Sequence, residues 1–214
     1  MRVIAVPVSS LDQAKSRLAS ALTPLERGAL ALAMLEDVLD ASLSIPGWDT
    51  WVISPDESVL EIAARRGARA LSEEKPPLGS AIRQVEREAA DAGAASLAVL
   101  LGDTALVTAE ALTRAVHTLG RVVVAPDTAH SGTNLLVRRP SRAIPARFGP
   151  DSYRKHLESA EVKGMPASVV ELPELAFDLD GPGDILTLLQ TNRGGRTRQV
   201  CLDMDLRSRI QIRT

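Results

Sequence analysis

Short apolar segments alternate with longer segments of helical pattern along most of this 214-residue chain. Such alternation is typical of βαβ units, in which helices join parallel strands. Residues 97–101 are all apolar, so this strand should be buried on both faces, as in a mainly parallel sheet covered by helices. After Gly120 the expected strands follow one another more closely, which predicts a mixed sheet. The expected fold is therefore α/β, a Rossmann-like three-layer sandwich with a mixed, mainly parallel sheet.

Apolar runs and capping signals place the individual elements. Thr23-Pro24-Leu25-Glu26 is a capping box with proline at the first helical position, so a helix should begin there and end near Ser44. The other expected helices are 58–66, 80–92, 108–119, 151–159 and 182–190. The expected strands are 3–6, 51–54, 97–101, 122–125, 134–138, 168–172 and 176–179.

A chain of this length should form one domain with room for a sizeable core. This domain is expected to span residues 1–190. Residues 191–214 form an arginine-rich C-terminal extension, for which an added strand, a subunit contact and a frayed end are all open alternatives.

Composition argues against several classes of partner. The net charge is only −2, which gives no electrostatic support for binding nucleic acid or a membrane surface. Aromatic residues make up 2% of the chain, too few for a base-stacking platform. No segment approaches the roughly 20 apolar residues of a membrane helix. The single cysteine, Cys201, excludes an internal disulfide and fits a reducing compartment, so a cytoplasmic enzyme is expected.

Acidic residues follow two of the expected strands. Asp103 comes after the apolar run 97–101, and Asp178 and Asp180 lie at the end of the expected strand 176–179. Carboxyl ends of buried strands border the crevice where α/β folds bind ligands, and residues two apart on a strand point the same way. Because hard divalent cations prefer oxygen ligands, Asp103, Asp178 and Asp180 predict a magnesium site in an enzyme that acts on phosphates. For Asp103, an ordinary helix cap is the alternative.

Two cationic residues, Lys15 and Arg17, lie in the first loop, directly after the first expected strand. A bound triphosphate needs such cations, and each contact is worth on the order of 4 kcal/mol before desolvation at an effective dielectric near 20. A solvated surface loop is the alternative. The chain has neither a Walker loop nor a Gly-x-Gly-x-x-Gly after the first strand. Three scattered histidines and one cysteine do not support a zinc site.

Two polar segments suit an acidic acceptor. Thr133 and Asn134 follow a glycine at the start of an expected strand, and Gly149 and Ser152 precede or begin an expected helix. Free N–H groups and the dipole at a helix N-terminus favour phosphate or carboxylate. Ordinary turn and cap chemistry is the alternative for both segments.

The order and spacing of these motifs resemble the CofC/FbiD family, the guanylyltransferases of coenzyme F-420 (deazaflavin) biosynthesis. These enzymes are similar in fold to MobA and to sugar-phosphate nucleotidyltransferases, the nucleotide-diphospho-sugar transferase type. The resemblance covers the chain up to about Gln190. The matching segments are 6–7, 14–18, 33–39, 54–56, 102–103, 126–127, 132–134, 148–152 with His156, and 178–184.

This resemblance implies an Mg²⁺-dependent transfer of GMP from GTP to the phosphate of a small phosphorylated carboxylic acid, with release of pyrophosphate. The acceptor would be phosphoenolpyruvate, 2-phospho-L-lactate or 3-phospho-D-glycerate. The product would pass to a downstream deazaflavin-coupling transferase, and a homodimer is an open alternative to a monomer.

The resemblance also implies a role for each matching residue. The catalytic residues would be Lys15, Arg17 and Asp103. The nucleotide would bind to Lys15, Arg17, Ser54 and Asp56. The metal ligands would be Asp103, Asp178 and Asp180. The acceptor would bind to Thr133, Asn134, Gly149 and Ser152.

Some positions depart from the family pattern. The family usually has proline shortly after Gly-Asp, asparagine where this chain has Gly79, and threonine where it has Gly181. These differences bear on nucleotide preference and on the acceptor. They leave three alternatives open: a nucleotidyltransferase with a sugar-phosphate or molybdopterin acceptor, a nucleotide-diphospho-sugar glycosyltransferase, and a non-catalytic protein that binds GTP or a phospho-acid.

Overall fold

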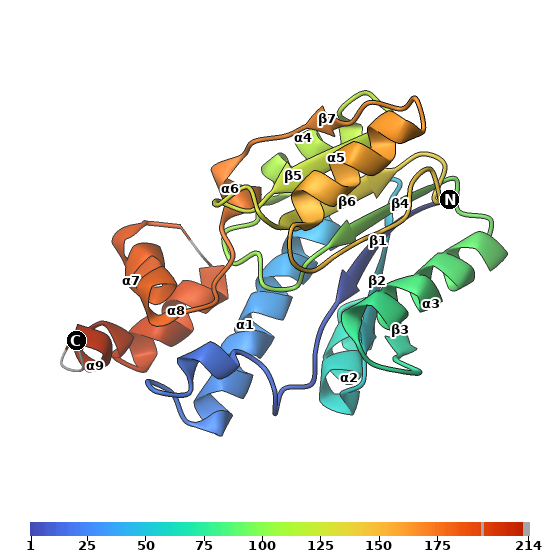
Figure 1. Ribbon diagram of the computed structural model, residues 1–214. Coiled ribbons are helices and arrows are strands. Elements are labelled where there is room, and N and C mark those ends of the chain that lie inside the picture. Colours follow the sequence, from blue (N-terminus) through green and yellow to red (C-terminus); the bar gives the residue numbers. More distant parts are fainter. Residues whose placement is uncertain (194, 212–214) are drawn as a thin grey trace.

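A seven-stranded sheet with the order β3-β2-β1-β4-β6-β5-β7 forms the centre of the molecule (Figure 1). The computed structural model describes residues 1–193 and 195–211. The strands are β1 Arg2–Pro7, β2 Asp49–Ser54, β3 Arg69–Ser72, β4 Ser96–Leu100, β5 Val122–Pro126, β6 Thr133–Arg138 and β7 Ser168–Val169. The helices are α1 Pro24–Leu43, α2 Glu57–Arg65, α3 Leu78–Asp91, α4 Ala109–His117, α5 Ser152–Val162, α6 Pro173–Ala176, α7 Pro182–Gln190, α8 Gly195–Asp203 and α9 Leu206–Gln211, with a short 3-10 helix, η1, at Ser16–Leu18.

The sheet is mixed and mainly parallel, as the sequence predicts. Strands β3, β2, β1 and β4 run parallel to one another. Strand β6 is antiparallel to both β4 and β5, and β7 is parallel to β5. The four parallel strands therefore place their carboxyl ends at one edge of the sheet, where loops from distant parts of the chain meet.

Helices cover both faces of the sheet, which confirms the predicted three-layer arrangement. Successive residues of β1 point to opposite faces. Ile4 packs with α1, α2 and α4, whereas Val3 packs with α3. Helix α5 covers the face of β6 that carries Leu136, which pairs with Val99 on the same side as α3. Among the described residues, none of the helices combines the length and apolar character that crossing a bilayer requires.

The capping box predicted for the first long helix is present. Thr23 Oγ1 accepts a hydrogen bond from Glu26 N at 3.3 Å, and the Glu26 carboxylate accepts one from Thr23 N at 2.8 Å. Pro24 occupies the first turn, and the helix ends at Leu43 with Ser44 as its C-cap. Local chemistry alone therefore determines where α1 begins.

Most of the predicted C-terminal extension is helical and packs on the domain. Cys201 of α8 and Leu206 of α9 are buried with residues of α1 and α7. Asp37 of α1 accepts hydrogen bonds from the backbone N–H groups of Arg196 and Thr197 at the start of α8. Helices α7, α8 and α9 lie together beside α1 (Figure 1). The added strand is thus not formed within 195–211, whereas Gly194 and residues 212–214 of this extension lie outside the described residues.

Two element predictions are wrong. The expected strand 176–179 is replaced by the end of α6 and an irregular segment, because Pro173 at the first turn starts a helix there. The short strand β3 was not predicted, since it has only four residues at the sheet edge and includes the polar, exposed Arg69 and Ser72 instead of an apolar run.

Candidate active site

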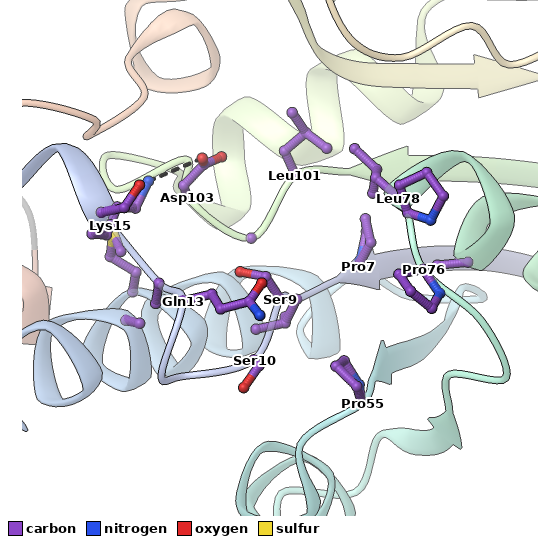
Figure 2. A pocket seen from close by; sticks show the side chains of 18 of the residues that line it. Pro7, Ser9, Ser10, Gln13, Lys15, Pro55, Pro76, Leu78, Leu101 and Asp103 are labelled. Atoms are coloured by element: carbon purple, nitrogen blue, oxygen red, sulfur yellow. Dashed lines mark hydrogen bonds and ion pairs between the residues drawn. The ribbon is translucent and has the colours of Figure 1, made fainter. Parts of the chain in front are cut away.

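A cavity of about 710 Å³ opens at the carboxyl ends of β1, β2 and β4 (Figure 2). Its volume is in the range of small-molecule sites, and its place is the crevice where α/β sheets bind ligands. The wall is formed by residues of the first loop, α1, the segments after β2, β3 and β4, the start of α3, and Asp180. The cavity is therefore large enough for a nucleotide.

Charged residues from three distant segments meet at one end of this cavity. Lys15 Nζ donates to Asp103 Oδ2 and to Asp180 Oδ1, each at 3.0 Å. Arg17 Nη1 donates to the other oxygen of Asp180 at 3.1 Å. Figure 2 shows Lys15 and Asp103 facing each other, with the interaction between them dashed. The structure therefore brings together Lys15, Arg17, Asp103 and Asp180.

The backbone of the first loop aims Lys15 at the two carboxylates. Lys15 adopts a left-handed conformation with φ of 50° just before η1. Its neighbours Ala14 and Leu18 are buried, which anchors the loop on α1 and α7. Burial lowers the pKa of Lys15, but the charges and hydrogen bonds of Asp103 and Asp180 outweigh this effect, so that the pKa is raised overall. The ammonium group is therefore protonated at neutral pH.

Asp103 has one carboxylate oxygen that lacks a partner. Its Oδ1 is buried and accepts no hydrogen bond from the residues that the structure describes. An anionic oxygen in this state carries an uncompensated desolvation cost, which a bound cation would relieve. This orphaned oxygen is the first observation that fits a metal ligand.

Asp178 lies close to the same cluster. Burial, followed by the negative charges of Asp103, Asp180 and Asp127, raises the pKa of Asp178 to about 6. The backbone N–H of Leu179 donates to Asp103 O at 3.3 Å and holds the segment around Asp178 against the loop after β4. Asp178 and Asp180 extend from irregular backbone, not from the strand that the sequence predicts.

The aspartate carboxylates are suitable ligands for a hard divalent cation, but the Lys15 side chain lies among them. Among residues 1–193 and 195–211, no group of three acidic, histidine or cysteine side chains is already arranged to hold a metal ion. The Lys15 ammonium lies between Asp103 and Asp180. Aspartate oxygens are suitable ligands for Mg²⁺, provided that Lys15 gives up its position between them.

Ser54 and Asp56, the other predicted nucleotide contacts, organise the wall of the cavity without lining it. Ser54 is fully buried, and its Oγ accepts from Asp56 N at 3.1 Å. The Asp56 carboxylate caps α2 through Ser58 N at 3.0 Å and accepts from Leu11 N at 3.1 Å, which ties the first loop to β2. Between them, Pro55 lines the cavity. Direct contact of Ser54 and Asp56 with a nucleotide stays a prediction.

The predicted acceptor residues lie outside the cavity lining. Asn134 is buried, and its Nδ2 donates to Leu175 O at 3.0 Å and Ala176 O at 3.1 Å, so the amide holds α6 in place. Gly149 has a φ of +110°, which favours glycine. Ser152 is the buried first residue of α5, and its N–H donates to Gly149 O at 3.1 Å. A role for these residues in binding the acceptor stays a prediction.

Thr133 contacts a buried histidine. Thr133 Oγ1 lies 3.0 Å from Nδ1 of His156. The other ring nitrogen, Nε2, accepts from Arg147 N at 2.8 Å. His156 therefore carries its proton on Nδ1 and donates it to Thr133. Burial and the charges of Arg138 and Arg147 lower the pKa of His156 to about 3.

This depressed pKa predicts an acid-sensitive fold. The unfolded chain takes up a proton near the ordinary pKa of 6.5 but folded His156 does not, so its contribution to stability is complete above that value and is lost toward about 3. We expect the free energy of unfolding to fall by about 2 kcal/mol between about pH 7 and pH 5 because of this residue. Chemical denaturation at both pH values measures it.

His156→Gln is the matched variant because glutamine does not titrate. The pH-dependent loss in the wild-type protein should exceed that in the variant by this amount. An identical loss in both proteins would rule out His156 as the cause.

The far end of the cavity includes residues that the sequence motifs did not single out. Glu73, Pro76 and Leu78 line it, and the peptide bond between Pro76 and Pro77 is cis. The sequence pointed to this end only through the family resemblance, in which Gly79 replaces an asparagine at a position that bears on nucleotide preference. Their common location depends on the position of α3 next to β1 and β2.

Comparisons with known proteins identify the family of this chain. A family model described as guanylyl transferase CofC like matches residues 1–210. A phosphoenolpyruvate guanylyltransferase of Rubrobacter xylanophilus is 40% identical over 86% of this chain and 91% of its own length. A 3-phospho-D-glycerate guanylyltransferase of Phenylobacterium zucineum is 34% identical over 92% of this chain and 94% of its own length.

Solved structures support the fold. A protein of Desulfovibrio desulfuricans G20, provisionally named a nucleotide-diphospho-sugar transferase, superposes with a TM-score of 0.78 at 18% identity, covering 99% of this chain and 98% of its own. A 4-diphosphocytidyl-2C-methyl-D-erythritol synthase superposes with a TM-score of 0.58 at 15% identity, covering 89% of this chain and 99% of its own. The predicted nucleotide-diphospho-sugar transferase type of fold is confirmed. With a family model matching almost its whole length, the chain belongs to the CofC-like guanylyl transferase family.

Proposed function

We propose that this protein transfers GMP from GTP to the phosphate of a small phosphorylated carboxylic acid and releases pyrophosphate, as a step of coenzyme F-420 biosynthesis. The observation that carries the proposal is the meeting of Lys15, Arg17, Asp103 and Asp180 at one end of a nucleotide-sized cavity. Phosphoenolpyruvate is the acceptor that we propose first, because several of the matching relatives bear the name of that activity. The product would then serve a downstream deazaflavin-coupling transferase.

The reaction is an in-line displacement at the α-phosphorus of GTP. An oxygen of the acceptor phosphate forms a bond to this phosphorus while the bond from the α-phosphorus to the bridging oxygen of pyrophosphate breaks. The attacking oxygen is already an anion, so no general base is needed. Most of the barrier comes from bringing anions together, and fixed positive charge lowers it.

Lys15 and Arg17 supply that positive charge. The Lys15 ammonium is protonated and buried, with its side chain 9% exposed, so its charge acts in a poorly screened environment. Arg17 is exposed and presents a planar fork toward the same end of the cavity. When the triphosphate enters, both cations exchange a carboxylate partner for phosphate oxygens and hold the departing pyrophosphate.

We propose that three carboxylates hold Mg²⁺, those of Asp103, Asp178 and Asp180. The unpartnered Oδ1 of Asp103 and the raised pKa of Asp178 both indicate negative charge that lacks a cation. When bound, the metal would neutralise charge on phosphate oxygens. The residues of this chain contribute the position and the anionic wall of the site.

Pyrophosphate release tests the proposal. The protein should release pyrophosphate from GTP and Mg²⁺ only when a phospho-acid is added, with phosphoenolpyruvate compared against 2-phospho-L-lactate and 3-phospho-D-glycerate. Reactions without acceptor, and with a sugar phosphate as acceptor, are the controls. Formation of GDP only when a GDP-sugar replaces GTP as the donor would indicate glycosyl transfer, and GTP binding without any turnover would indicate a non-catalytic protein. Either result overturns the proposal.

A further inference from the structure

The end of the cavity away from Lys15 is apolar. Figure 2 shows Pro7, Pro55, Pro76 and Leu78 on the side opposite Lys15 and Asp103. Proline rings and a leucine side chain offer apolar surface to the faces of a planar ring system, whereas the charged end suits phosphates. If the triphosphate lies at Lys15, the base of the nucleotide therefore lies among these residues.

One carboxylate lines the cavity beyond β3, away from the charged cluster. Glu73 follows β3, and its backbone N–H donates to Ser54 O at 2.9 Å, which fixes it at the edge of the sheet next to Pro55. Glu73 is half-buried, and this burial raises the pKa of its carboxyl group. Within residues 1–193 and 195–211, its side chain takes part in no hydrogen bond or ion pair that would consume the carboxylate.

The neighbouring residue provides a contrast. Glu74 is exposed, does not line the cavity, and accepts from Arg87 Nη2 at 2.9 Å. Its backbone N–H donates to Gln84 Oε1 at the same distance. The two adjacent glutamates thus differ in their contacts. Glu74 forms a surface ion pair, whereas Glu73 lines the cavity and has both carboxylate oxygens available.

Guanine is the base whose hydrogen-bonding edge complements such a group. Its N1–H and its N2 amino group are adjacent donors, and an ionised carboxylate offers two acceptor oxygens. Adenine presents an acceptor at N1 instead, which a carboxylate repels. A half-buried acceptor left unpaired by the wrong base is the kind of feature that gives strong discrimination.

We propose that Glu73 recognises the guanine of the donor nucleotide through N1–H and the N2 amino group and so determines the preference for GTP. This inference rests on the proposed function only for the assignment of the triphosphate to the Lys15 end. It identifies a specificity-determining residue at a position that the sequence motifs did not indicate.

Nucleotide competition tests the proposal. Displacement of a fluorescent guanine nucleotide by GTP, ITP, XTP and ATP measures binding in the absence of any acceptor. In the wild-type protein, ITP, which lacks the N2 amino group, should bind at least about 10-fold more weakly than GTP. In Glu73→Gln, the affinity for GTP should fall by roughly 100-fold. The affinity for XTP should rise, because the amide N–H can donate to the xanthine O2. If the ratio of the affinities for GTP and XTP were the same in Glu73→Gln as in the wild-type protein, the proposal would be overturned.

Two further variants make the result specific. Glu74→Gln removes a carboxylate one residue away and should leave the order of the four nucleotides unchanged. Glu73→Asp keeps the carboxylate but shortens its reach, so GTP should bind more weakly while still being preferred to XTP. This variant also tests the proposal if Glu73→Gln does not fold, since wild-type affinity for GTP in Glu73→Asp would contradict the assigned contact.

Failure of this inference is distinguishable from failure of the proposed function. If GMP transfer to a phospho-acid occurs but Glu73→Gln keeps the wild-type order of nucleotides, only the inference fails. If Glu73 controls the binding of GTP but no phospho-acid yields pyrophosphate, the inference stands and the proposed function fails.

Discussion

Asp103→Asn is expected to lower GMP transfer by roughly 1000-fold or more while leaving the fold intact. Asparagine has the same shape as aspartate but lacks the charge that binds Lys15 Nζ at 3.0 Å and the anionic character of the buried Oδ1. If Asp103 holds Mg²⁺, the variant loses a ligand as well as a charge. Steady-state release of pyrophosphate measures the effect, and the thermal midpoint of unfolding checks the fold.

A second readout separates a metal ligand from a structural residue. Titration of Mn²⁺, followed by electron paramagnetic resonance without nucleotide, should show at least about tenfold weaker binding in Asp103→Asn. Asp49→Asn is the matched control, because Asp49 is an exposed aspartate at the start of β2, away from the cavity. Transfer near the wild-type rate in Asp103→Asn would disprove the assignment of Asp103.

Lys15→Met is expected to have an effect of similar size on transfer, but the opposite effect on the response to metal. Removing the ammonium group takes away the cation between Asp103 and Asp180 and leaves only the contact of Arg17 with Asp180. We expect a loss of roughly 1000-fold in transfer, since the departing pyrophosphate loses its most buried cation. Because Asp180 is 39% exposed and partly screened by solvent, the loss of stability should be only on the order of 1 kcal/mol.

Mg²⁺ should compensate for part of this lost stability. In the wild-type protein the ammonium competes with the metal for the two carboxylates, whereas in Lys15→Met only the exposed Arg17 still competes, and only for Asp180. Thermal unfolding with and without Mg²⁺, in the absence of nucleotide, should therefore show a larger stabilising shift in the variant. Lys163→Met, at an exposed lysine after α5, is the control for removing a positive charge. A smaller shift in Lys15→Met than in the wild-type protein would show that Lys15 does not occupy the position of the metal.

Part of the site could be predicted because the relevant chemistry is local. Thr23 and Glu26 are three residues apart, and their mutual hydrogen bonds define the start of α1 in any context. Asp184 likewise accepts from the N–H groups of Asp180 and Gly181, as expected for a residue in the first turn of a helix. Acidic residues after β4 were expected at the ligand-binding edge, and Asp103 does line the cavity.

Other parts could not be predicted because competing local signals were overlooked or absent. Pro173 starts a short helix where an apolar run suggested a strand, so Asp178 and Asp180 leave irregular backbone and differ in their surroundings. Asn134 has the composition of a ligand-binding residue, but its amide is used by the carbonyl groups of α6. Whether a polar side chain is available to a ligand depends on which partners the fold brings to it.

The sequence by itself determined the class of fold, since continuous apolar strands separated by amphipathic helices are stable only when helices cover both faces of a mainly parallel sheet. It also indicated the acidic and cationic side chains that we propose to carry the chemistry. Only the tertiary structure decided which of them meet: Lys15 contacts Asp103 across 88 positions and Asp180 across 165, and Glu73 faces the apolar end of the same cavity. The physical reason is that these encounters follow from the strand order β3-β2-β1-β4, which results from the packing of the whole core and not from any local pattern.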